Sequence, residues 1–230
     1  VYAFTDIDGH FTLHNFAKFF SHSEAIQTFL YSVMIAVFNT AICLLIGYPA
    51  AYIMAQEDFK TPKVMAMLFI LPMWINFLLR TVATVELFNM FGLPLGEGAL
   101  LFGLCYDYLP FMIYPIYNTL QKMDNSLVEA AQDLGASRWQ SVWKVIVPLS
   151  MPGVYSGVVM VFMPTVSTFA IAELLTHNNI KLFGSLIQDY ITTTDLLNYG
   201  AVLSLVLLII IGLTSFFGDN NDDGEKGGMI

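Results

Sequence analysis

Five apolar runs of membrane-spanning length constrain this chain more than any other feature. Each matches or exceeds the roughly 20 mostly apolar residues that a helix needs to cross a bilayer. Hydrophobic residues make up 57% of the sequence and charged residues 12%, whereas an ordinary soluble domain has about 25% charged residues. We therefore expect an all-α membrane protein, a polytopic bundle of helices. The runs cover residues 28–54, 64–85, 99–120, 149–172 and 196–217.

Lys and Arg residues predict how these runs are oriented, because positively charged loops stay in the cytoplasm. We expect residues 1–27 to lie outside, 28–217 to form the membrane domain with a cytoplasmic loop at 121–148, and 218–230 to form a disordered cytoplasmic tail. Five spans with an external start are an odd layout, so we also expect a first span upstream of Val1. The basic residues that agree with this orientation are Lys60, Lys63, Lys122, Arg138, Lys144 and Lys226.

Two short helices are predicted in the loop between the third and fourth runs. A capping box, in which a Ser and a Glu or Gln three residues later bond each other's backbone, fits at Ser126–Glu129 and again at Ser137–Gln140. Gly135 suits the left-handed residue that ends the first helix, and Pro148 is expected to stop the second. The predicted helices span residues 127–134 and 138–147.

Each short helix carries one apolar face with i, i+3, i+4, i+7 spacing. Helices of this length are not stable alone, so the faces must pack on something. The protein's own spans, the lipid surface and the groove of a partner all remain open on physical grounds. The faces consist of Leu127, Ala130, Ala131 and Leu134 on the first helix, and of Trp139, Val142, Trp143 and Ile146 on the second.

Glycines and prolines within the runs predict close packing and kinks. Gly153 and Gly157 form a small-xxx-small pair in the fourth run, which favours close approach of a neighbouring helix. Prolines inside a helix remove a backbone hydrogen bond and bend it. Prolines within the runs include Pro49, Pro72, Pro110, Pro115 and Pro164.

The stretch EAAQDLGASRWQSVWKVIVPLSMPG (129–153) closely resembles the EAA loop of ABC importer permeases, whose membrane domain is of the MetI-like kind. That pattern has Glu-Ala-Ala, a Gly six residues after the Glu, and a later aliphatic-x-Leu-Pro, which reads Val145 to Pro148 here with Val for Ile and Leu. The resemblance implies the helical bundle of type I importers and a coupling helix that docks on the ATPase. The implied coupling residues are Glu129, Ala130, Ala131, Leu134, Gly135, Trp139, Trp143 and Pro148.

The same resemblance implies the partners of the chain. The sequence has no G-x-x-x-x-G-K-[ST] motif, so it lacks a phosphate-binding loop of that type, and we expect no enzymatic activity. ATP and Mg²⁺ would be bound by a separate ATPase dimer, alongside a second homologous permease subunit and an extracytoplasmic substrate-binding protein, in a bacterial inner membrane. The net charge of −9 argues against a nucleic-acid partner, and no metal site is expected at His10 and His14.

Three further stretches are similar to the membrane subunits of spermidine/putrescine importers. The similarity covers roughly residues 28–217 and implies that polyamines are the cargo. An importer of another small solute remains an alternative, as does a channel or secondary transporter. The sequence departs from that pattern at the short connection 86–98, at Asp107 and at Glu173. The stretches are LPMWINFLLRT (71–81), YDYLPFMIYPIYNTL (106–120) and VFMPTVSTFAI (161–171).

Carboxylates and aromatic rings within the runs or near their outer ends suggest a path for a cation. A carboxylate within a membrane, such as Asp107, is a functional-site hypothesis by default. Arg80 is the competing explanation, because an ion pair between the two would make Asp107 structural. Interfacial solvation is the stronger explanation for Glu86 and Glu173, and membrane-interface belts and core packing explain most aromatic residues. The predicted path consists of Asp107, Glu173, Glu86, Trp74, Tyr106 and Tyr108.

Overall fold

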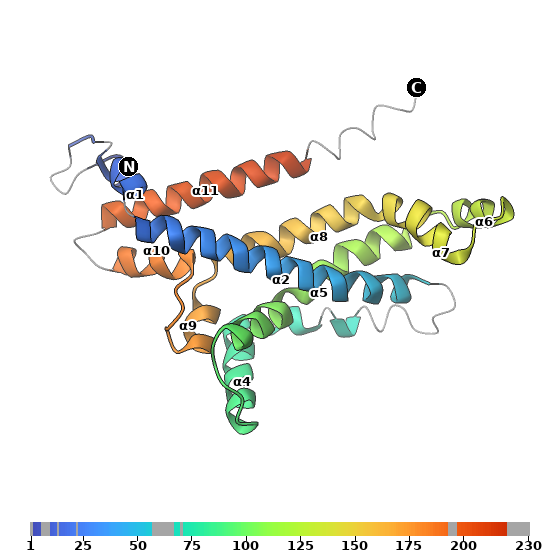
Figure 1. Cartoon of the computed structure of the whole chain (residues 1–230), viewed down its shortest axis with the longest axis horizontal. Helices are drawn as coiled ribbons and strands as arrows, with labels where there is room; N and C mark the ends of the chain where they lie inside the picture. The colour runs from blue at the N-terminus through green and yellow to red at the C-terminus, as the bar shows by residue number, and fades with distance from the viewer. Residues whose placement is uncertain are drawn as a thin grey trace.

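The computed structural model describes residues 2–5, 10–12, 14–21, 23–56, 67–69, 71–192 and 197–219, and side chains up to residue 212. These residues form an elongated bundle of helices (Figure 1). In chain order they are η1 (Tyr2–Phe4), α1 (His14–Ser21), α2 (Ser23–Ala55), η2 (Leu71–Trp74), α4 (Phe77–Met90), α5 (Glu97–Gln121), α6 (Ser126–Asp133), α7 (Arg138–Ser141), the π-helical turn η3 (Val142–Ile146), α8 (Val147–Ser167), α9 (Ala170–Thr176), α10 (Phe183–Thr192) and α11 (Leu197–Asp219).

Helices α2, α5 and α8 pack on one another and form the centre of the bundle. The predicted close approach at Gly153 is confirmed, because a Cβ there would lie 2.8 Å from the carbonyl oxygen of Pro115 on α5. Met112 of α5 fills the space between two further glycines, with its Sδ 2.8 Å from a Cβ built on Gly157 and its Cγ 3.0 Å from one built on Gly47. Small residues therefore let the three helix backbones come close.

Hydrogen bonds between side chains tie α2 to its neighbours within the apolar core. The Asn39 amide donates to the Thr165 hydroxyl of α8 at 3.1 Å, and the hydroxyls of Tyr48 and Ser150 lie 2.9 Å apart. The hydroxyl of Ser32 accepts from the backbone N–H of Phe183 at the start of α10, at 2.7 Å. The side chains of Ser32, Asn39 and Tyr48 are thereby satisfied inside the protein.

The predicted runs are only partly continuous helices. Among the described residues, three helical stretches are long and apolar enough to cross a membrane: Ser23–Ala55, Glu97–Gln121 and Arg138–Ser167. They contain the first run, the third run and most of the fourth, and the fifth run forms α11. The expected tail at 218–230 begins inside α11, which extends to Asp219, and 220–230 lie outside the described residues.

Two of the runs are broken rather than straight. The second run bends by 100° between Met67–Trp74 and α4, where the Asn76 side chain accepts a hydrogen bond from the Leu78 N–H and starts a new helix. The fourth run stops at Thr168, whose backbone is extended at φ −67° and ψ 145°, before α9 begins. An N-cap therefore starts a new helix within the second run, and an extended residue ends α8 within the fourth. Hydropathy alone would have continued a single helix through each of these positions.

Different short helices lie at the two ends of the bundle. Helices α6 and α7 lie at one end, near the last turns of α2 and α5, and α1 and α10 lie at the other end (Figure 1). This places the C-terminal ends of α2 and α5 on one side of the bundle, as the distribution of Lys and Arg predicts. Which end faces the cytoplasm stays a prediction.

Candidate functional site

Residues 121–148, called the coupling segment below, lie at one end of the bundle and contain the short helix α6, followed by α7 and η3. Gly135 has a φ of +91°, which confirms the predicted left-handed turn after α6. The predicted capping box of α7 is also confirmed. The Ser137 hydroxyl accepts from the Gln140 N–H at 3.3 Å, and the Gln140 side chain accepts from the Ser137 N–H at 2.9 Å.

The capping box predicted for the first helix is wrong. Ser126 is the first residue of α6, and its backbone N–H donates to the Asp124 carboxylate at 2.9 Å. This hydrogen bond holds the pKa of Asp124 below its usual value. The Asp124 carboxylate, rather than the Glu129 side chain, accepts the Ser126 N–H, because a carboxylate two residues before a backbone N–H closes an Asx turn. The Ser126 hydroxyl is therefore not needed as a cap.

The prediction that Pro148 stops the second helix is also wrong. Helix α7 continues through the π-helical turn η3 into α8, so Arg138–Ser167 is one uninterrupted helix. In this turn the Val147 N–H bonds to the Val142 oxygen five residues earlier. Proline is excluded from a regular helix by its missing N–H and by its clash with the carbonyl four residues back. Pro148 is tolerated because it lies at the start of α8, directly after the wider π turn. This position relieves both the missing N–H and the clash with the earlier carbonyl.

The apolar faces of the coupling segment are largely exposed. Leu134 is 90% exposed and Trp139 is 70% exposed, and Trp143 stacks edge-on against Trp139 with ring centroids 5.7 Å apart. The predicted shared face of the second helix is therefore split, since Ile146 is only 5% exposed and packs into the core. Glu129 and Arg138 line a hollow of about 370 Å³ between the two helices and the end of α2.

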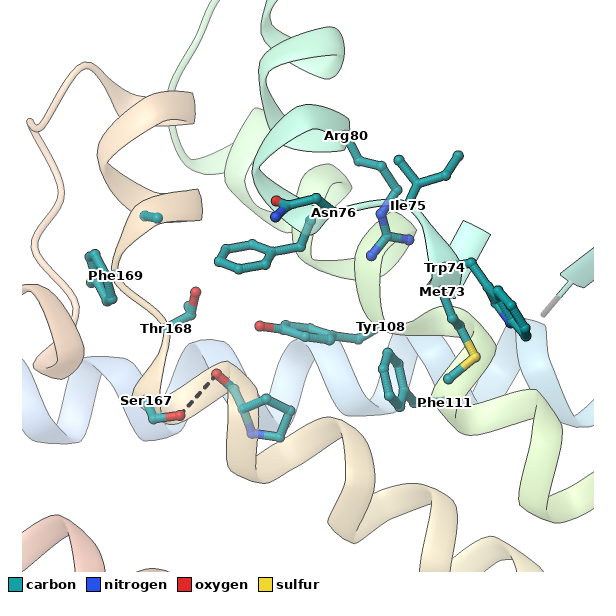
Figure 2. A pocket seen from close by; sticks show the side chains of 13 residues that line it. Met73, Trp74, Ile75, Asn76, Arg80, Tyr108, Phe111, Ser167, Thr168 and Phe169 are labelled. Atoms are coloured by element: carbon teal, nitrogen blue, oxygen red, sulfur yellow. Dashed lines mark hydrogen bonds between the residues drawn. The ribbon is translucent and has the colours of Figure 1, made fainter. Parts of the chain in front are cut away.

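A pocket of about 590 Å³ lies where the two broken runs meet. One wall is the bend between η2 and α4, a second is α5, and the third is the end of α8 with the start of α9 (Figure 2). Discontinuous helices of transporters commonly form their ligand sites in this way. The residues that line it are Met73, Trp74, Ile75, Asn76, Phe77, Arg80, Tyr108, Phe111, Pro164, Ser167, Thr168, Phe169 and Ala170.

Arg80, which lines this pocket, forms an ion pair with Asp107, which does not line it. The Arg80 Nε lies 3.2 Å from the Asp107 Oδ1, and the two side chains are 6% and 1% exposed. The Thr81 hydroxyl donates to the other carboxylate oxygen at 3.2 Å. The Nε–Oδ1 contact lacks the alignment of a hydrogen bond, so the pair is held by charge. The guanidinium also lies 5.8 Å from the centre of the Tyr106 ring.

The structure brings only some of the predicted path residues together. Trp74 and Tyr108 line the pocket, whereas Asp107 is buried behind Arg80. Glu86 is exposed on α4, and Glu173 is half-buried on α9. The path therefore stays a prediction, and the competing explanation for Asp107, pairing with Arg80, is what the structure shows.

Sequence reasoning missed several pocket residues that belong to the helix breaks. Asn76, Thr168 and Phe169 line the pocket because two helices end or begin there. An Asn directly before an apolar run is an N-cap signal and could have revealed the first break. The second break offers a weaker signal, because Pro164 lies three residues before the last residue of α8.

Sequence comparisons place the chain among transport proteins. The family described as "Binding-protein-dependent transport system inner membrane component" matches residues 47–220. The spermidine/putrescine transport system permease protein PotB of Escherichia coli (strain K12) is 33% identical over 220 residues, which cover 88% of this chain and 80% of that protein. PotC of the same organism is 28% identical over 208 residues, which cover 89% of this chain and 78% of PotC.

A comparison with solved structures supports the fold. An inward-facing MetNI methionine ABC transporter has a chain that matches with a TM-score of 0.70 at 18% identity, covering 85% of this chain and 93% of that one. At this identity the likeness concerns the fold alone, which is that of a membrane subunit of an ABC transporter.

Proposed function

Because this chain belongs to the family of binding-protein-dependent transport system inner membrane components, we propose that it carries polyamines inward as one of two permease subunits of an ATP-driven importer. ATP and Mg²⁺ are bound by a separate ATPase dimer, and an extracytoplasmic binding protein delivers the cargo. The named relatives PotB and PotC support both the cargo and the pairing of two different permease subunits. The chain itself needs no catalytic residues for this role.

The exposed apolar surface of the coupling segment is the observation that carries the proposal. Leu134, Trp139 and Trp143 lie at the end of the bundle with most of their surface uncovered by the described part of this chain. Large aromatic side chains left uncovered on a helix surface are typical anchors of a protein interface. We assign this surface to the ATPase, so that movement of the ATPase is transmitted along the continuous helix Arg138–Ser167 into the membrane.

The cargo path is the finer part of the proposal. Glu86, Glu173 and Tyr106 are the groups that we propose to face a cation, because a polyamine carries several ammonium groups that carboxylates and ring faces attract. Trp74 and Tyr108 form the walls of the pocket. Asp107 contributes by holding Arg80 in place. We also propose that the coupling segment faces the cytoplasm and α1 the outside, in agreement with the Lys and Arg distribution.

Transport by the assembled complex tests the proposal. The chain is reconstituted with its ATPase, second permease subunit and binding protein in proteoliposomes, and uptake of radiolabelled putrescine and spermidine is measured with and without ATP. We expect ATP-dependent uptake of both polyamines. Trp139→Ala with Trp143→Ala should weaken binding of the ATPase about tenfold or more, as loss of interface anchors does.

Phe20→Ala is the matched control, because Phe20 is an exposed aromatic residue at the opposite end of the bundle. It should leave both uptake and ATPase binding unchanged. Uptake without any ATPase subunit would instead identify a channel or secondary transporter. A complex that imports sugars or anions but ignores polyamines would show that the cargo is assigned wrongly.

A further inference from the structure

Gly184, near the start of α10, lies directly against the break between α8 and α9. A Cβ built on Gly184 would overlap the carbonyl oxygen of Ser167 and lie 2.6 Å from that of Thr168. Real side chains do not approach backbone oxygens this closely, so only a residue without a Cβ lets α10 take this position. The Cα hydrogens of a glycine can instead face the oxygens, as they do where two backbones meet.

The residues at this break form one wall of the pocket between the two broken runs. Ser167 ends α8, Thr168 is extended, and Phe169 directly precedes α9. All three line the pocket, and the Thr168 side chain lies beside the Tyr108 hydroxyl of α5 (Figure 2). Gly184 does not line the pocket, so it can act on a bound molecule only through the residues of the break.

The start of α10 is held in place from its other side by α2. The Phe183 backbone N–H donates to the Ser32 hydroxyl at 2.7 Å, and this hydroxyl donates to the Thr28 carbonyl oxygen at 2.8 Å. The Phe183 side chain is fully buried, with its ring edge-on to Phe29 at 5.2 Å between centroids. Retreat of α10 would break a buried hydrogen bond and uncover this ring. Extra bulk at position 184 should therefore displace the break rather than α10.

We propose that Gly184 is a positioning residue for the pocket. Its close contact with the Ser167 and Thr168 carbonyls fixes where α8 ends, and so sets how the wall formed by Thr168 and Phe169 stands relative to α5 and to the bend before α4. Helix α10 is thus part of the machinery that shapes the pocket, although it contributes no lining residue. The effect on cargo rests on the proposed function, whereas the effect on pocket geometry does not.

A distance measured across the pocket tests the geometric part without any transport assay. Ile75→Cys and Phe169→Cys place spin labels on two different walls, in a background with Cys43→Ala and Cys105→Ala, and both positions are exposed enough to be labelled. The separation of the labels is measured by continuous-wave EPR on the full chain in nanodiscs. Gly184→Ala should change this separation, because the break has to move away from the added Cβ. An unchanged separation overturns the proposal, whatever the cargo is.

Gly200→Ala is the matched control for crowding around α10. A Cβ on Gly200 of α11 would lie 3.1 Å from the backbone nitrogen and from the Cγ1 of Ile191, at the other end of α10. This variant should leave the separation of the labels as in the parent. An equal change in both variants would show that any disturbance of α10 alters the pocket, and would overturn the specific role of Gly184.

Uptake kinetics test the consequence for transport. In the reconstituted complex, Gly184→Ala should raise the KM for putrescine about threefold to tenfold, as the loss of one hydrogen bond to the cargo would. The maximal rate per inserted protein should stay near that of the parent. A lower maximal rate with an unchanged KM would indicate a merely structural role and overturn the proposal. A parent complex that takes up no polyamine, together with the expected change in label separation, would reject the proposed cargo and keep the role of Gly184.

Ser32→Ala provides a second test that adds no bulk. It removes the acceptor of the Phe183 N–H and so loosens the start of α10. Smaller changes than those of Gly184→Ala, in both the label separation and the KM, are expected. If Gly184→Ala does not reach the membrane, the Ser32→Ala result decides, and parent-like values in both measurements overturn the proposal.

Discussion

Gly135 shows how one residue fixes the geometry of the coupling segment. Its φ of +91° lies in the left-handed region that residues with a Cβ avoid. A Cβ added there would meet no atom within 4 Å, so packing does not forbid a larger residue. The backbone alone requires glycine at this turn, and the turn sets the angle between α6 and α7.

Two substitutions separate backbone strain from side-chain size at this position. Gly135→Val should cost about 1–2 kcal/mol in the turn, misplace the short helices and abolish coupled uptake while the protein still reaches the membrane. Gly135→Asn should be far milder, because Asn adopts the left-handed conformation more readily. Affinity for the ATPase and uptake are measured at matched membrane levels. Equal effects of Val and Asn would indicate that side-chain volume, not φ, matters here.

Small residues decide how closely helices α5 and α8 approach each other. Gly153 of α8 faces the Pro115 carbonyl and Thr119 on α5, and Gly157 faces Met112. Pro115 lies inside α5, so its carbonyl belongs to the backbone of a long helix and cannot easily retreat. Helix α8 continues from the coupling segment, and both α5 and α8 contribute residues to the pocket. The contact between α5 and α8 therefore holds both features in position.

Substitution at Gly153 should loosen this contact. Gly153→Ala puts a Cβ 2.8 Å from a backbone oxygen, closer than packing permits, and should destabilise the protein by about 1–3 kcal/mol as overpacking does. Gly98→Ala on α5 is the control, since its Cβ would meet nothing within 4 Å and alanine favours a helix. Thermal unfolding in detergent is the measurement. A loss of stability that is the same for both variants would refute the packing argument.

At the scale of the whole molecule, the bundle is longer than a bilayer is thick. Helix α2 has 33 residues, which is about 50 Å at 1.5 Å per residue, against a hydrocarbon core of about 30 Å. Its first turns pack with α1, α10 and α11 in a separate apolar cluster. This cluster lies at the end of the bundle opposite the coupling segment (Figure 1).

Labelling of introduced cysteines distinguishes the two ends. In a background with Cys43→Ala and Cys105→Ala, a cysteine at Ala17 on α1 should react with an impermeant thiol reagent applied from outside. A cysteine at Gln132 on α6 should react only after the membrane is opened. Both positions are exposed, so access rather than burial decides the result. Reaction of both from the same side would contradict the orientation that the Lys and Arg residues predict.

Features that depend on neighbours in the chain were predictable from sequence. The apolar runs, the left-handed Gly135 and the Ser137 cap each follow from a short window of residues. Where two local signals compete, sequence reasoning failed. Asp124 rather than Glu129 bonds the start of α6, and Pro148 continues a helix because a π turn precedes it. A favourable capping residue or a proline in the sequence does not by itself predict either outcome.

The sequence by itself determined where the long apolar helices lie and where the coupling segment turns, because hydropathy over 20 residues and the φ preference of glycine are local properties. Only the tertiary structure decided that Arg80 pairs with Asp107 and that two broken runs meet at one pocket. It also decided that Trp139 stays exposed while Ile146 is buried on the same helical stretch. These outcomes depend on contacts between helices far apart in the chain, and such contacts override the periodicity of any one segment.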